Sequence, residues 1–150
     1  MATLNMYWYG RGIEAFKNGS VDWEADTIKV ALMGSTYTPS QGSDQFFNDI
    51  SADEASGSGY TAGGETLANA TLTYDSANSR VTLDGDNVVW DPSTITARYA
   101  VIYRDGATPG TDDFLIGYGD AGSDQTSSGS PFTIEWNASG ILRSTAESAP

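Results

Sequence analysis

Residues 95–104 read ITARYAVIYR, and this stretch contains the longest strand pattern in the chain. Side chains of an extended chain alternate between its two faces. Both faces of this segment carry apolar side chains: Ala97, Tyr99, Val101 and Tyr103 on one, and Ala100 and Ile102 on the other. A strand that is apolar on both faces has to be covered on both sides. The segment therefore predicts the central strand of a sheet.

Shorter alternating segments precede and follow this central strand. The polar residues 75–78 separate two of them and are typical of a hairpin turn. Asp91-Pro92 is expected to stop the pairing of Val88–Trp90, because proline has no N–H to donate. The alternating segments are residues 27–33, 71–74, 80–83, 88–90, 114–118, 132–136 and 141–142. About eight short strands predict an all-β fold, an antiparallel β-sandwich of jelly-roll-like type.

Helical periodicity is confined to two short pieces. Ile13–Lys17 and Asp44–Ile50, the latter with Ser43 as its cap, each predict one or two helical turns. Ser51–Glu65 and Gly119–Ser130 are rich in small and polar residues, so both are predicted to be loops. The expected organisation is an N-terminal arm with a short helix at 1–20, a β-sandwich domain at 21–143, and a flexible C-terminal tail at 144–150.

Composition and charge narrow the range of functions. Twenty acidic and seven basic residues give a formal net charge of −13, which repels phosphate and argues against nucleic-acid binding. The chain contains no His and no Cys, which excludes a Ser-His-Asp triad, a Cys nucleophile and a zinc site of nitrogen and sulfur ligands. No signal peptide is expected at the N-terminus, and no apolar run is long enough to predict a membrane span.

Carboxylates are the remaining candidates for catalysis or metal binding. Asp84, Asp86, Asp112, Asp113 and Glu65 lie in or beside predicted turns, where acidic side chains accept backbone hydrogen bonds and stay solvated. We therefore expect them to be turn residues and the chain not to be an enzyme, with a two-carboxylate glycosidase as the weaker alternative. No cofactor is predicted. A structural Ca²⁺ ion at residues 84–87 or 112–113 stays open, although neither segment has the spacing of a calcium loop.

Tryptophan and tyrosine give two further hypotheses. Trp90 and Trp136 lie in alternating segments, so they are expected to pack in the core. Trp8 and Trp23 are the candidates for a sugar-stacking platform, which a carbohydrate-binding module would need.

The N-terminal segment carries the candidate partner-binding residues. Met6, Tyr7, Trp8 and Tyr9 place four large side chains in succession, so both faces of a strand there must be covered, and Arg11 follows. A partner or the chain's own sandwich would provide that cover. The sequence leaves these two alternatives open.

Several of these segments together resemble a group of small structural proteins of tailed bacteriophages. The resemblance extends over about residues 21–142. It is carried by DTIKVAL at 26–32, YTP at 37–39, GSGYTAGG with Thr66-Leu67 at 57–67, TARYAVIY at 96–103, and residues 132–136. These are strand and loop patterns, and they bring no catalytic residues with them.

The resemblance implies a virion component associated with the phage head. The expected role is a capsid cement, or decoration, protein that is assembled in the host cytoplasm, binds the major capsid protein on the capsid exterior, and self-associates as a homotrimer. Two alternatives remain at this stage: a structural or receptor-binding protein of the tail or tail tip, and a carbohydrate-binding β-sandwich module.

Overall fold

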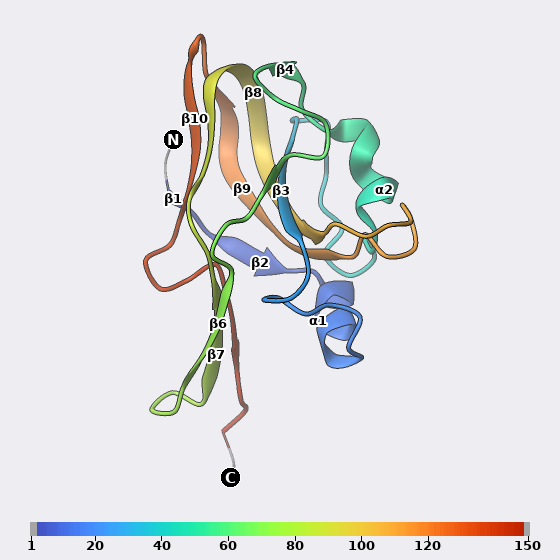
Figure 1. The fold of residues 1–150 in the computed structure, drawn as a ribbon, viewed down its shortest axis with the longest axis vertical. Helices are drawn as coiled ribbons and strands as arrows, with labels where there is room; N and C mark the ends of the chain where they lie inside the picture. The colour runs from blue at the N-terminus through green and yellow to red at the C-terminus, as the bar shows by residue number, and fades with distance from the viewer. Residues whose placement is uncertain (1–2, 149–150) are drawn as a thin grey trace.

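The computed structural model describes residues 3–148, and strands are its main secondary structure, which confirms the all-β class (Figure 1). Two short helices and one 3-10 turn complete the fold. The elements in chain order are β1 (Thr3–Leu4), β2 (Met6–Trp8), α1 (Gly10–Lys17), β3 (Ile28–Met33), α2 (Phe47–Ile50), η1 (Ser51–Asp53), β4 (Gly57–Ser58), β5 (Glu65–Thr66), β6 (Thr71–Asp75), β7 (Arg80–Asp84), β8 (Val88–Arg104), β9 (Leu115–Thr126), β10 (Ser130–Trp136) and β11 (Leu142–Thr145).

Strand β8 is the central strand that the sequence predicts. Its C-terminal half lies between β3 and β9, and its N-terminal half pairs with β10. Ala100, Val101 and Ile102 are completely buried, so both faces are covered as expected. One detail differs, because a register shift against β9 separates Ala97 from Tyr99. Ala97 therefore packs in the same cluster as Ile102 and not with Tyr99.

The expectation that pairing stops at Pro92 is wrong, because β8 runs through this residue for 17 residues in all. Trp90 lies opposite Phe132 and Ser93 lies opposite Ser130, so the register against β10 shifts between these pairs. Asp91 and Pro92 occupy this irregularity. A bulge leaves a residue without a ladder hydrogen bond, and proline is tolerated where no N–H is required.

The loop predicted at Gly119–Ser130 is also wrong over most of its length. Strand β9 continues to Thr126, which pairs with Thr96 of β8. The composition misleads here because Gly119 is required by close packing and not by a turn: a Cβ atom on it would lie 2.7 Å from Met6 Sδ and 2.8 Å from Leu4 Cγ. Glycine in a strand marks such a close approach of neighbouring chain.

The N-terminal segment is not an arm, since the chain from Thr3 onward belongs to the main sheet. Strand β1 pairs in parallel with β10, and β2 pairs antiparallel with β9. Leu4 is 3% exposed and Tyr9 is 0% exposed, and burial of such side chains is what holds the segment in place. The parallel β1–β10 pair also means that the main sheet is mixed. Residues 1 and 2 of the predicted arm lie outside the described residues.

These pairings close a circuit. Hydrogen-bonded neighbours lead from β8 to β9 and from β9 to β2; the chain then joins β2 to β1, and β1 leads through β10 back to β8. Figure 1 shows β2 running across the lower end of the main sheet, between β10 and β9. The circuit has the character of a small barrel, in which few strand edges remain open.

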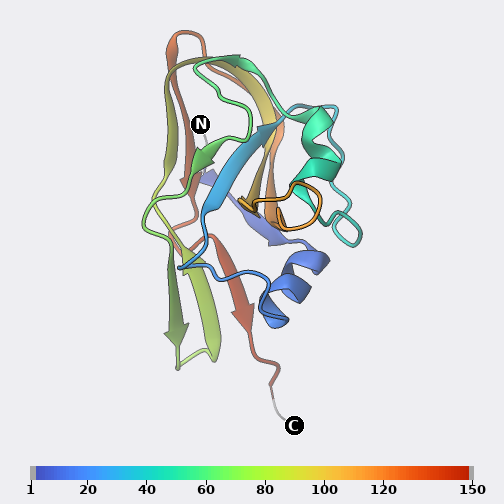
Figure 2. The same cartoon turned by 45° about the vertical axis from the view of Figure 1, so that its right-hand side comes forward.

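A second sheet of three strands, in the order β11-β7-β6, projects below the first (Figure 2). The predicted hairpin is confirmed: Thr71 pairs with Asp84 and Asp75 pairs with Arg80. The tail predicted from residue 144 begins too early, because Ser144 and Thr145 belong to β11 and pair with β7. A strand with polar side chains on its exposed face looks like a tail in the sequence. Residues 149 and 150 lie outside the described residues.

The helices are short and lie beside the sheets. α1 confirms the helix expected at Ile13–Lys17, and α2 is shorter than the predicted Asp44–Ile50, with Phe46 and not Ser43 at its N-cap. Residues 51–65 are irregular apart from η1 and short β-pairings, as the sequence indicates. Trp90 and Trp136 are buried in the core, which confirms the prediction for both. No helix within residues 3–148 is long and apolar enough to cross a membrane.

Integration of the N-terminal segment can be tested with two neighbouring substitutions. Leu4→Ala removes a buried side chain, so we expect the free energy of unfolding to fall by about 2–5 kcal/mol. Tyr7→Ala removes a side chain that is 55% exposed, and we expect a loss within about 1 kcal/mol. Urea unfolding of both variants is the measurement. Small and equal losses would mean that residues 3–9 are a loosely attached arm after all.

Candidate functional site

A groove of about 600 Å³, open to solvent, lies between β2 of the main sheet and β11 of the second sheet. We call it the β2–β11 groove. Three of the five predicted partner-binding residues, Met6, Tyr7 and Trp8, line it. The other lining residues are Asn5, Gln41, Arg80, Asn137, Gly140, Ile141, Leu142, Arg143 and Thr145. The groove is therefore built from both ends of the chain and from the β7 hairpin.

The β2 side of the groove is a strand edge. Tyr9 N–H donates to the Ile116 carbonyl of β9 at 3.1 Å, and backbone groups of a strand alternate in direction. The backbone of Trp8 accordingly points away from β9, and its carbonyl accepts a hydrogen bond from Gln41 Nε2 at 2.8 Å. Among the described strands, β2 pairs only with β9. Its second edge faces the groove.

The β11 side is a strand edge as well. Ala146 N–H donates to the Ser79 carbonyl, so the backbone groups of Ala146 point toward β7. Because these groups alternate in direction along a strand, those of residues 144 and 142 also point toward β7. Those of Arg143 and Thr145 point away from β7. The Arg143 carbonyl accepts a hydrogen bond from Trp8 Nε1 at 2.9 Å. Trp8 therefore ties the two strand edges together at one end of the groove.

The groove carries basic side chains that have no acidic partner, on a protein whose net charge is strongly negative. Four of the seven basic side chains form ion pairs with acidic side chains: Arg11 with Glu14, Lys29 with Asp105, Arg98 with Asp120, and Arg104 with Asp26. Within residues 3–148, the other three have no acidic group within 4.0 Å. Two of these three, Arg80 and Arg143, line the groove, and none of the lining residues is acidic.

Arg80 is held at the rim of the groove. Its Nε donates to Thr145 Oγ1 at 3.0 Å. Asp75 is its cross-strand neighbour, but the Asp75 carboxylate accepts hydrogen bonds from Asn78 Nδ2 and the Ala77 amide. The hydrogen bond from Asn78 is the main cause that lowers the pKa of Asp75, and the charge of Arg80 contributes less. The guanidinium of Arg80 thus remains available to an acidic group from outside.

The remaining two predicted partner-binding residues do not belong to the groove. Tyr9 is completely buried, and its hydroxyl lies 2.6 Å from that of Tyr37. Burial raises the pKa of both phenols above the usual range, so both stay neutral. The prediction for Tyr9 is therefore wrong, because the core of the protein itself covers this ring. Arg11 is exposed on α1, where it pairs with Glu14 at 3.0 Å.

Sequence reasoning missed Arg80, Arg143 and Gln41. A signal exists for Arg143, since residues 136–146 around it contain no acidic residue in a chain of charge −13. For Arg80 and Gln41 the only relevant information is the spatial arrangement of β2, β7 and β11.

A second, apolar groove of about 160 Å³ continues from Trp8 between α1 and the three-stranded sheet. We call it the α1–β7 groove. Phe16 contacts Trp8 edge-on at 5.3 Å between ring centres, while Ile13 and Leu72 are about 40% exposed. Val81, Leu83, Lys17 and Ser144 also line it. Trp8 therefore lies where a polar, positive groove meets an apolar one.

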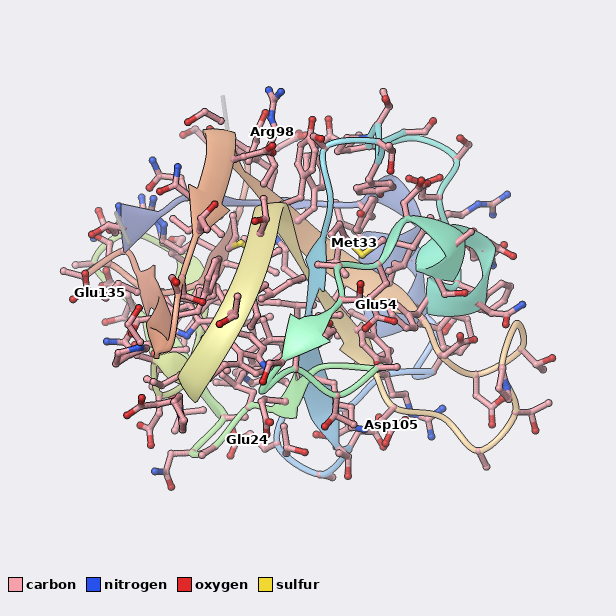
Figure 3. All side chains as sticks on the ribbon, turned by 90° about the horizontal axis from the view of Figure 1, so that it is seen from above. Glu24, Met33, Glu54, Arg98, Asp105 and Glu135 are labelled. Atoms are coloured by element: carbon pink, nitrogen blue, oxygen red, sulfur yellow. The ribbon has the colours of Figure 1, made fainter. Side chains whose placement is uncertain are left out.

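Three of the five carboxylates considered for catalysis either hold local structure or lie in an exposed strand. Asp113 is buried and accepts hydrogen bonds from the Asn48 and Gly110 amides, so it holds a loop. Asp86 accepts a hydrogen bond from Asn69, and Glu65 lies in the exposed strand β5. Acidic side chains are spread around the surface, as Glu24, Asp105 and Glu135 show in Figure 3. Within residues 3–148, no group of three or more His, Cys, Asp or Glu side chains is placed to hold a metal ion.

The predicted sugar-stacking pair is not formed. Trp23 is 1% exposed, and its Nε1 donates to the Asp84 carbonyl at 3.1 Å. Trp23 is therefore a core residue, and it cannot stack on a sugar together with Trp8.

No protein-family model matches the chain, and the comparisons with curated proteins and with solved structures find no significant match.

The bond from Trp8 to β11 gives a test of the groove's construction. Trp8→Phe keeps an aromatic ring beside Phe16 but removes the donor to the Arg143 carbonyl, so we expect a loss of about 1 kcal/mol in the free energy of unfolding. The amides of residues 143–145 should also exchange faster with solvent. Tyr74→Phe, at a ring that is 65% exposed, is the control. Unchanged exchange in β11 would show that Trp8 does not hold the groove together.

Proposed function

We propose that this chain is a non-enzymatic structural protein of a tailed-phage virion, a capsid cement protein that binds the major capsid protein on the outside of the head. The observation that carries the proposal is the β2–β11 groove, which combines Tyr7, Trp8 and two arginines without acidic partners on a protein of charge −13. Aromatic and arginine side chains are the groups most enriched at protein interfaces. The resemblance of residues 21–142 to phage structural proteins supplies the class of partner.

The physical properties of the chain suit an adhesive role. Many copies on one shell add modest contacts into a large total stabilisation. The excess of carboxylates keeps the decorated particle soluble. None of these properties requires an active site.

The assembly we propose is a homotrimer at threefold positions of the capsid lattice, and we interpret the two sheets as the layers of a jelly-roll-like sandwich. The homotrimer comes from the resemblance, and the sandwich comes from the number of short strands. Closed symmetry in such an oligomer would repeat the groove, so that each trimer would present three of them to the shell.

The proposal is tested by mixing the purified chain with undecorated capsids of its own phage and imaging them by electron microscopy. We expect ordered extra density on the capsid exterior. Arg80→Gln combined with Arg143→Gln should weaken capsid binding at least about tenfold, because hydrogen bonds to charged groups contribute roughly 1.5–3 kcal/mol each.

The control variant is Arg98→Gln, since Arg98 lies on β8, already pairs with Asp120 at 3.0 Å and does not line the groove. It should bind capsids as the unaltered chain does. Absence of density on the capsids contradicts the cement role, and binding to purified tails in place of heads would assign the chain to the tail.

A further inference from the structure

We propose that the β2–β11 groove receives an extended, acidic segment of the partner protein as a β-strand added to the free edge of β11. This inference rests on the proposed function in one respect only, namely that the groove is the partner-binding surface. It goes further by naming the chemistry and the conformation of the bound segment.

The backbone groups at the groove are available for pairing with another strand. The edges of β2 and β11 that face it are unpaired with any other described strand, apart from the two side-chain bonds to the Trp8 and Arg143 carbonyls. An exposed strand edge offers a row of backbone donors and acceptors, and an extended peptide satisfies them by adding a strand. A helical segment has its own backbone groups already paired, so it cannot use this edge.

The basic side chains at the groove match the spacing of alternate residues on a β-strand. Arg143 and Thr145 are two positions apart on β11, so their side chains lie on the same face, and Thr145 is paired with Arg80 of β7. Residues two apart on a strand are separated by roughly 6.8 Å. A partner strand with acidic side chains at every second position matches this arrangement. Its carboxylates would reach Arg143 and Arg80 in turn.

The charges around the groove favour an acidic ligand. The surface of this protein is strongly negative, so an acidic segment is repelled elsewhere and attracted only where basic groups lack acidic partners. Asn5 and Asn137, which hydrogen-bond each other at 3.0 Å, add polar groups to the opposite wall. The groove therefore selects an acidic segment over a neutral or basic one.

The experiment selects binders of the full chain from a ribosome-displayed library of random peptides. We expect the selected peptides to have Asp or Glu at alternating positions between strand-forming residues. Their affinity should fall at least about tenfold on the Arg80→Gln, Arg143→Gln double variant and stay unchanged on Arg98→Gln, because only the former loses charge-assisted hydrogen bonds to the peptide.

Backbone methylation of a selected peptide tests the added strand directly. N-methyl groups at every second residue should abolish binding in one phase of the alternation and leave it largely intact in the other, because a strand that pairs with the β11 edge alone turns only alternate amides toward β11. Equal sensitivity at all positions, equal affinity for both arginine variants, or a selection that enriches no acidic peptide would overturn the inference. The inference would also be overturned if the chain bound single-stranded oligothymidylate and the double variant did not. In that case the two arginines would bind phosphate groups.

This result and the capsid experiment fail separately. If capsids are decorated but the methylation pattern is absent, the cement role is supported and binding by an added strand is contradicted. If selected peptides bind as expected but capsids and tails are not decorated, the groove binds acidic extended peptides but the proposed function is wrong.

Discussion

The packing of Leu4 and Tyr9 into the core is the constraint on which the rest of the structure depends. Their burial holds β1 against β10 and β2 against β9, and these two pairings close the circuit of strands around β8. Burying two large apolar side chains contributes several kcal/mol, which is a substantial fraction of a domain's net stability. Gly119 makes the closure possible, because a larger residue there would collide with Leu4 and Met6.

Closure of the circuit also produces the β2–β11 groove. Strand β2 uses one edge to pair with β9, so its other edge turns toward the three-stranded sheet, where β11 presents a second unpaired edge. Trp8 spans the two through its bond to the Arg143 carbonyl. The N-terminal residues therefore have two roles that sequence reasoning treats as alternatives: Leu4 and Tyr9 complete the core, while Tyr7 and Trp8 face a groove. Leu4 and Tyr9 lie on opposite faces of the segment, since Leu4 packs in one core cluster and Tyr9 in the other.

Periodicity predicted those parts of the fold that local patterns determine. The central strand at 95–104, the β6–β7 hairpin and the buried Trp90 all follow from alternation and turn residues. Composition misled where tertiary contacts require an unusual residue, as with Gly119 in β9 and Pro92 in a bulge of β8. For the candidate site, three of the predicted residues, Met6, Tyr7 and Trp8, line the groove. The arginine wall could not be predicted, because it depends on the register that brings Thr145 of β11 opposite Arg80 of β7.

Native-state hydrogen exchange at the Tyr9 amide tests the central claim most directly, since this amide donates to the Ile116 carbonyl at the junction of β2 and β9. If the N-terminal strands close the circuit, Tyr9 exchanges only when the whole domain unfolds, with the same opening free energy as Val101 in the middle of β8. Exchange of Tyr9 that is orders of magnitude faster than that of Val101 would show that the segment detaches on its own, and the closed circuit with its groove would not be the native structure.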